Sequence, residues 1–264
     1  MLGREEFQLT VGMVFAFLFG LAVGSFLNVC IYRIPLKKSI VSPPSSCPQC
    51  ESRIRFYDNI PVLSYLLLLG RCRQCRARIS LRYPLVELIV GLLSAALFLA
   101  LGPSLPYLFL FLFTAALVAI AFIDLDHKII PDVISLPGIL VGLIFSFFPS
   151  AGLSPVDALI GAVGGAAFLL LVGVAFEKVT GREGMGGGDV KLLAMIGAWM
   201  GWKALPFILL LSSFTGAVIG GLSLAVSRQG MRSRIPFGPF LALGALLFLF
   251  FGDAIVLWFN RLGR

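Results

Sequence analysis

The sequence predicts an all-α polytopic membrane protein, with about eight transmembrane helices and a small cytoplasmic insert between the first two. Hydrophobic residues make up 59% of the 264 residues and charged residues only 13%, and the mean hydropathy is +1.00. Soluble domains carry about 25% charged residues. Apolar runs of about twenty residues recur along the chain, and a helix of that length crosses the ~30 Å hydrocarbon core of a bilayer.

Eight apolar runs are the candidate spans. The first follows an acidic segment with Glu5 and Glu6 and has no small-residue cleavage site after it, so we interpret it as a span and not a cleaved signal peptide. The fourth starts at Asp132, an ordinary helix start after a proline. The sixth is the shortest. In chain order the runs cover residues 9–31, 84–101, 105–123, 132–148, 156–176, 189–202, 204–226 and 237–259.

The distribution of Lys and Arg predicts the orientation of these spans. Residues 33–82 hold ten of the 21 basic residues, and with eight spans Lys128 and the basic residues of segments 178–191 and 228–234 lie on the same side. Basic residues favour the cytoplasmic side, so both termini are expected outside. This bias explains most of the net charge of +8, and nothing further in the sequence indicates nucleic-acid binding. The opposite side keeps only Arg4, Lys203, Arg261 and Arg264.

Residues 33–83 contain two close cysteine pairs in the pattern C-x2-C-x21-C-x2-C. Four thiolates at this spacing can converge on one tetrahedral metal ion, as in a zinc ribbon. Two disulfides are the alternative, but disulfides rarely persist in a reducing cytoplasm. We therefore expect a structural zinc site that holds together a segment too small to fold around its own core. Its ligands would be Cys47, Cys50, Cys72 and Cys75.

Aspartates from two separate loops are expected to reach the same face of the membrane. The segment "FIDLDHKIIPD" (residues 122–132) carries Asp124, Asp126 and Asp132, and "GGGD" (residues 186–189) ends in Asp189. Each one alone is more often a helix cap than a catalytic group. Glycines before Asp189, however, let a substrate backbone or a second carboxylate come close, and ionisable groups at membrane depth often mark function.

Two carboxyl groups in one site favour aspartic proteolysis, because neighbouring carboxylates cannot both ionise easily and share one proton. The ionised member then takes a proton from water, while the protonated member hydrogen-bonds the scissile carbonyl. Other catalytic classes fit poorly, since His127 is the sole histidine and neither H-E-x-x-H nor G-x-S-x-G is present.

Several long motifs resemble those of the type IV prepilin peptidases, a family of membrane aspartic proteases with a G-x-G-D motif. They are "GSFLNVCIYRIP" (residues 24–35), "CPQC", "DNIPVLSYL", "GRCRQC" and "ISLRYPLVE" (within residues 47–87), "DLDHKIIPD" (residues 124–132) and "GGGDVKLL" (residues 186–193). By motif position the resemblance implies Asp124 and Asp189 as the catalytic pair, with Asp126 as a rival for the first place. It also implies a zinc-type cluster of the four cysteines.

The resemblance further implies a bifunctional enzyme of the bacterial inner membrane. Such an enzyme removes the short basic leader of type IV prepilins and pseudopilins at the cytoplasmic face, and N-methylates the new amino terminus with S-adenosylmethionine. No residue in the sequence indicates where that cofactor binds. The expected domains are the first transmembrane segment (residues 1–32), the cytoplasmic four-cysteine domain (residues 33–83) and the transmembrane peptidase domain (residues 84–264).

Three alternatives remain at this stage. A presenilin-like intramembrane protease shares G-x-G-D, but its partner aspartate follows a tyrosine, whereas Ile123 precedes Asp124. A transporter would use the aspartates as an ion path, but the spans carry few charges and no inverted repeat is visible. A non-enzymatic scaffold with a zinc-bound docking module is the third.

Overall fold

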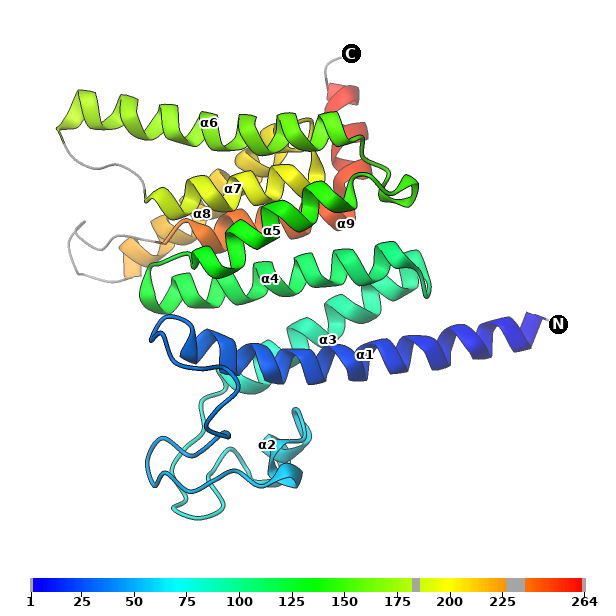
Figure 1. The fold of residues 1–264 in the computed structure, drawn as a ribbon, viewed down its shortest axis with the longest axis vertical. Coiled ribbons are helices and arrows are strands. Elements are labelled where there is room, and N and C mark those ends of the chain that lie inside the picture. The colour runs from blue at the N-terminus through cyan, green and yellow to red at the C-terminus, as the bar shows by residue number, and fades with distance from the viewer. Residues whose placement is uncertain (1, 182–185, 227–235, 263–264) are drawn as a thin grey trace. The chain divides into compact units, whose positions relative to one another are not determined.

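The computed structural model describes residues 2–181, 186–226 and 236–262. These residues fold into helices and connecting turns, and they contain no named β-strand (Figure 1). The prediction of an all-helical protein is therefore confirmed. The basic residues Arg182, Arg228, Arg232 and Arg234, which entered the orientation argument, lie outside the described residues. Within the described ranges the eight long helices are α1 (Leu2–Arg33), α3 (Arg82–Leu101), α4 (Leu105–His127), α5 (Asp132–Phe145), α6 (Pro155–Thr180), α7 (Gly187–Met200), α8 (Leu205–Val226) and α9 (Gly238–Leu262).

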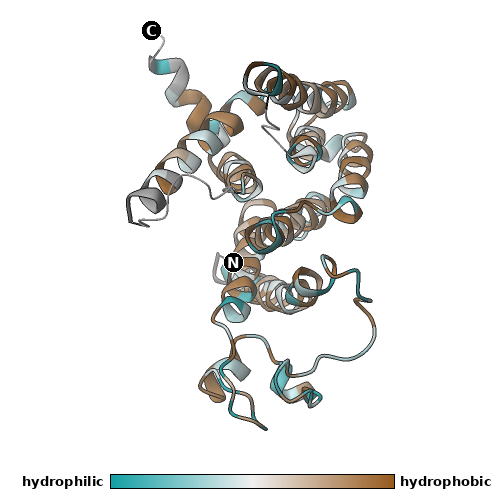
Figure 2. Ribbon diagram, turned by 90° about the vertical axis from the view of Figure 1, so that its left-hand side faces the viewer, coloured by the Kyte–Doolittle hydropathy of each residue, from teal (hydrophilic) through white to brown (hydrophobic). Residues whose placement is uncertain are grey.

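Each predicted span coincides with one of these helices, and their apolar character is evident along the ribbon in Figure 2. Five of them, α1, α3, α4, α6 and α9, are long and apolar enough to cross a membrane, and α5 and α8 contribute shorter apolar stretches. The sixth span is different. Helix α7 has 14 residues and is buried continuously from Leu192 to Trp199. At about 1.5 Å per residue it is shorter than a bilayer core, and an all-round apolar helix of this kind belongs inside a protein.

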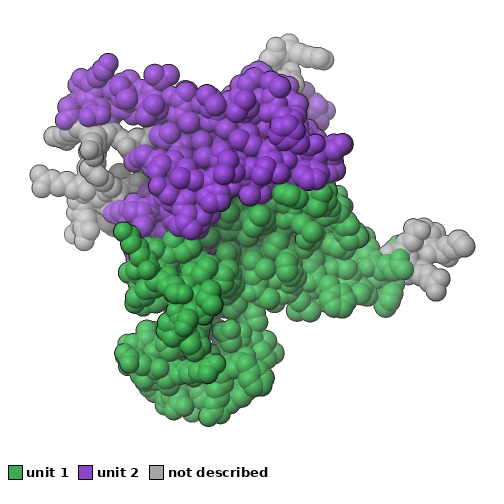
Figure 3. Space-filling view, viewed as in Figure 1, with its two compact units in different colours: residues 1–119 green, residues 120–264 purple. Residues whose placement is uncertain are grey.

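The chain divides into two compact units, Met1–Ala119 and Ile120–Arg264 (Figure 3). In unit 1, α1 packs along α3 through glycines. A Cβ on Gly24 would lie 2.7 Å from the Cα of Glu87, so only glycine permits this approach of the two backbones. The Ser94 hydroxyl is fully buried and donates to the carbonyl of Ala16 at 2.6 Å. This hydrogen bond makes a second contact between α1 and α3.

Between α1 and α3 lies the cysteine insert, which we define as residues 34–81. Its only regular elements are the short helices η1 (Phe56–Asn59) and α2 (Leu63–Leu67) and two isolated β-bridges, Ser46 with Arg53 and Arg71 with Arg78. A segment with so little secondary structure has little apolar core of its own, which agrees with the expectation of a metal-stabilised module.

In unit 2, α7 packs against α5, α6 and α9, and also meets α8. Its contact with α6 is close because Gly197 faces Gly161 and no Cβ would fit between them. Its contact with α5 is fixed by Trp199, whose Nε1 donates to the carbonyl of Gly138 at 2.8 Å. This packing holds the first turn of α7, which carries Asp189, in a defined place.

Candidate active site and metal centre

Asp124 lies in the last turns of α4 and is buried, with 5% of its surface exposed. Its Oδ2 accepts a hydrogen bond of 3.0 Å from the backbone N–H of Gly238. Gly238 is the first residue of α9, and the N–H groups of a first helical turn have no partner within their own helix. The positive end of α9 thus faces the Asp124 carboxyl group.

Gly238 belongs to the candidate site, although the sequence alone does not indicate it. A Cβ on it would lie 2.6 Å from Oδ2 of Asp124, so a larger residue would displace the carboxyl group. Pro239 follows it, and a proline in the first turn marks a helix start. That signal locates the beginning of α9, but it does not reveal a partner 114 residues earlier in the chain.

Asp189 lies in the first turn of α7, directly after Gly186, Gly187 and Gly188. It is partly buried, and it lies close enough to Asp124 for the charge of one carboxylate to act on the other. Gly188 contributes to this approach, because a Cβ there would lie 2.9 Å from the Cβ of Ile130 in the connection between α4 and α5. The two aspartates predicted from separate loops therefore lie near each other in unit 2.

Asp126 and Asp132, the other two aspartates of residues 122–132, are not part of this buried pair. Asp126 is exposed, although it is only two residues from the buried Asp124. Asp132 starts α5 and is also exposed, and its two carboxylate oxygens accept hydrogen bonds of 2.7 and 2.8 Å from the Nζ of Lys191. Since Lys191 lies in α7 two residues after Asp189, this ion pair joins the starts of α5 and α7 next to the aspartate pair.

This arrangement can perform acid–base chemistry on a bound water molecule. Two adjacent carboxyl groups hold one proton between them more readily than none, and they titrate as a unit. The Gly238 N–H binds Oδ2 of Asp124, and it is the hydrogen-bond donor to this carboxyl group among the residues that the structure describes.

The four cysteines of the insert converge as the sequence predicts. The Sγ atoms of the set lie within 4.8 Å of one another, and those of Cys47 and Cys75 are 3.8 Å apart. Four sulfurs each about 2.3 Å from a central zinc ion would be separated by about 3.8 Å. The residues therefore fit a tetrahedral metal ion, and they could hold one. The set is Cys47, Cys50, Cys72 and Cys75.

Each cysteine pair forms the same tight turn. The N–H of Cys47 donates to Ser52 O at 3.0 Å, and the N–H of Cys72 donates to Ala77 O at 2.8 Å. The residue after each second cysteine, Glu51 or Arg76, has a positive φ near 55–59°. Hydrogen bonds from Ser52 lower the pKa of Cys50 to about 6, whereas burial and the neighbouring cysteines raise the pKa of Cys75 to about 11. The cluster therefore favours a thiolate at Cys50 first.

Comparisons with known proteins cover most of the chain. Residues 18–101 match the model of the bacterial peptidase A24 N-terminal domain, and residues 111–221 match that of the type IV leader peptidase family. A prepilin leader peptidase/N-methyltransferase of Aeromonas salmonicida is 44% identical over 92% of each chain. Proteins of the same name from Pseudomonas putida and Pseudomonas aeruginosa are 44% and 43% identical over 89% and 90% of each chain. No solved structure matches. These findings do not favour the presenilin-like or transporter alternatives.

Proposed function

Because this chain belongs to the type IV leader peptidase family, we propose that it removes the leader peptide from type IV prepilins or pseudopilins and N-methylates the new amino terminus. Both activities appear in the name of relatives that match nearly the whole chain. The peptidase activity has a candidate site in unit 2. The methyltransferase activity is supported by the relatives' name.

We assign the cutting to Asp124 and Asp189. One observation supports these roles above all: Asp124 is buried, hydrogen-bonded to Gly238 N–H and close to Asp189, whereas Asp126 is exposed. The ionised member of the pair takes a proton from water, which attacks the scissile carbonyl. The protonated member hydrogen-bonds the carbonyl oxygen and later supplies a proton to the leaving amine.

We place this reaction at the cytoplasmic face of a bacterial inner membrane. The chain has several helices able to cross a bilayer, and most of its basic residues fall on the predicted cytoplasmic side. A basic leader stays on that side for the same reason, so the bond that follows it is presented there. Residues 33–83 would form the cytoplasmic domain, and residues 84–264 the peptidase domain.

The four-cysteine cluster fits a structural zinc ion, which would close its coordination shell with protein ligands. S-adenosylmethionine would supply the methyl group that is added to the new amino terminus. Within the described part of the chain the cysteine cluster lies in unit 1 and the aspartate pair in unit 2. The candidate zinc site and the candidate peptidase site therefore do not share residues.

A leader-release assay tests the peptidase assignment. Purified full-length protein in detergent is mixed with a synthetic prepilin, and the released leader is detected by mass spectrometry. Asp124→Asn and Asp189→Asn should each abolish release, because neither variant keeps two carboxyl groups. Asp126→Asn is the matched control and should cleave at nearly the normal rate. Normal cleavage by either of the first two variants would show that the pair is wrongly assigned.

A further inference from the structure

Unit 1 contains a cavity of about 500 Å³, which none of the residues assigned to peptide cleavage lines. It is bounded by the last turns of α1, the cysteine insert and the first turns of α3, and its volume lies within the ~300–1,000 Å³ of typical small-molecule sites. We propose that this cavity binds S-adenosylmethionine, a ligand that combines a sulfonium cation, a planar purine and an amino-acid group. This inference rests on the methyl transfer proposed above.

A buried carboxylate gives the cavity a place for a cation. Glu87 of α3 lines the cavity and is only 8% exposed. Its Oε2 accepts a hydrogen bond of 2.7 Å from the N–H of Val62, a neutral donor. Among the described residues no Lys or Arg forms an ion pair with it. A carboxylate withdrawn from water without a counter-charge is costly, and a bound sulfonium would supply that charge.

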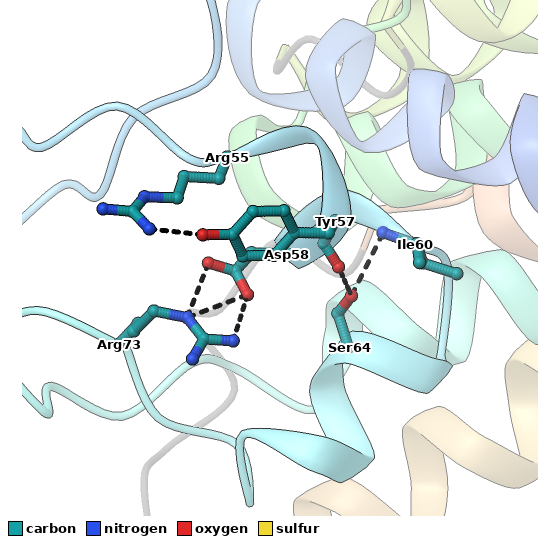
Figure 4. Close-up of polar contacts among 6 residues, drawn as sticks. All are labelled: Arg55, Tyr57, Asp58, Ile60, Ser64 and Arg73. Carbon is teal, nitrogen blue, oxygen red and sulfur yellow. Dashed lines mark hydrogen bonds and ion pairs between the residues drawn. The ribbon is translucent and has the colours of Figure 1, made fainter.

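The second acid that lines the cavity already has a partner. Figure 4 shows Arg73 in contact with both oxygens of Asp58, with Nη2 2.6 Å from Oδ1 and Nε 2.9 Å from Oδ2. Arg73 holds the pKa of Asp58 below its usual range, so this pair stays ionised and self-compensated. Glu87 is therefore the lining acid that remains to attract a cation.

Aromatic and basic groups complete the match to this ligand. Tyr65 and Tyr83 line the cavity, and tyrosine rings stack on planar heterocycles and attract cations. Arg55 also lines it; its guanidinium donates to the neutral hydroxyl of Tyr57 and so keeps a positive charge for a carboxylate (Figure 4). Asn28 is buried, and its Nδ2 donates to the carbonyl of Tyr83 at 3.0 Å, which fixes the wall between α1 and α3.

Calorimetric titration of the full-length protein in detergent tests this proposal with two ligands. S-adenosylmethionine carries the sulfonium charge, and S-adenosylhomocysteine has the same purine and amino-acid groups without it. Glu87→Gln keeps an acceptor for the Val62 N–H but removes the negative charge. We expect it to weaken binding of S-adenosylmethionine about tenfold or more, and binding of S-adenosylhomocysteine much less. Glu51→Gln removes the same charge from an exposed residue that does not line the cavity, and should change neither affinity.

The proposal is overturned if Glu87→Gln binds the charged ligand normally, or if it loses both ligands equally, since a merely structural effect would not distinguish them. It is also overturned if the variant loses affinity for the leader peptide instead of the methyl donor. Protease resistance of unit 1 reports whether the variant is folded there, and leader release reports the same for unit 2. Should Glu87→Gln fail to fold, Tyr83→Leu provides the test. Loss of the ring should weaken the binding of both ligands, and unchanged affinities would refute the site.

The same assays separate this inference from the proposed function. A wild-type protein that neither binds S-adenosylmethionine nor methylates a cleaved pilin would refute methyl transfer altogether. A wild-type protein that methylates, with Glu87 and Tyr83 variants that bind the donor normally, would refute only the location of the site.

Discussion

At the scale of single residues, the "DLD" motif places two identical side chains on different faces of one helix. Asp124 and Asp126 lie two positions apart, and residues at that spacing point to different faces of a helix. Asp124 is buried against Gly238, whereas Asp126 is exposed. Their chemical environments differ although their sequence environments are nearly the same.

The contact between Gly238 and Asp124 leads to a prediction. Gly238→Ala places a Cβ about 2.6 Å from Oδ2 of Asp124, so the carboxyl group must move. Since small displacements of a catalytic group are costly, we expect leader release to slow by about 100-fold. The rate of leader release at saturating substrate is the measurement.

A second glycine-to-alanine change controls for general effects on the α8–α9 contact. A Cβ on Gly216 of α8 would meet the side chain of Phe240 at an ordinary distance of 3.4 Å, and it would meet nothing of the aspartate pair. Gly216→Ala should cleave at close to the normal rate. Equal loss of activity in the two variants would indicate that helix packing, and not the carboxyl group, is responsible.

At the scale of helices and loops, the Asp132–Lys191 ion pair connects the starts of α5 and α7. The distance between Nζ and Oδ1 is 2.7 Å, and both side chains are substantially exposed. Exposed ion pairs contribute only about 0–1 kcal/mol to stability. We therefore infer that this one orients the first turn of α7, which carries Asp189, more than it stabilises the fold.

Removal of that ion pair should lower activity with little change in stability. Lys191→Gln is expected to slow leader release by up to about fivefold while the melting temperature stays nearly constant. Lys178→Gln removes the same charge from an exposed position in the last turn of α6 and serves as the control. Exchange of the two partners, Asp132→Lys with Lys191→Asp, should restore much of the rate. No rescue by the exchange would argue against an orienting ion pair.

The cysteine insert should depend on its metal for its folded structure. We expect about one zinc per chain by mass spectrometry of the metal content, and loss of that zinc with local unfolding in Cys47→Ser. The fifth cysteine provides the control: Cys30 is buried in α1 outside the cluster, so Cys30→Ala should keep the metal. A folded insert without zinc, seen as unchanged protease resistance, would contradict the structural role.

At the scale of the whole molecule, the helices could be predicted from the sequence because each is an apolar run bounded by polar residues. Even the shortest predicted span, residues 189–202, corresponds to α7. Its shortness was visible in the sequence. That its residues are buried on all sides was not, because this depends on the packing of α5, α6 and α9 around it.

The candidate sites are also predictable only in part, because local patterns reveal some of their residues and contacts between distant segments determine the others. Spacing alone brings the four cysteines together, since two close pairs on a short insert have few ways to fold around a metal. The alternation of spans predicts that the two aspartates lie on one face of the membrane. The Gly238 N–H and the cavity around Glu87 depend on contacts between distant segments, which no local pattern encodes.

The central claim is that Asp124 and Asp189 act on substrate as one unit. The most direct test measures binding of a prepilin peptide with a non-cleavable hydroxyl group in place of the scissile bond. Asp124→Asn and Asp189→Asn should each weaken this transition-state mimic by at least about 100-fold. The double variant should bind no worse than either single variant, because a pair that acts together is lost with its first member. Losses that simply add, or normal binding by one single variant, would contradict a shared carboxyl pair.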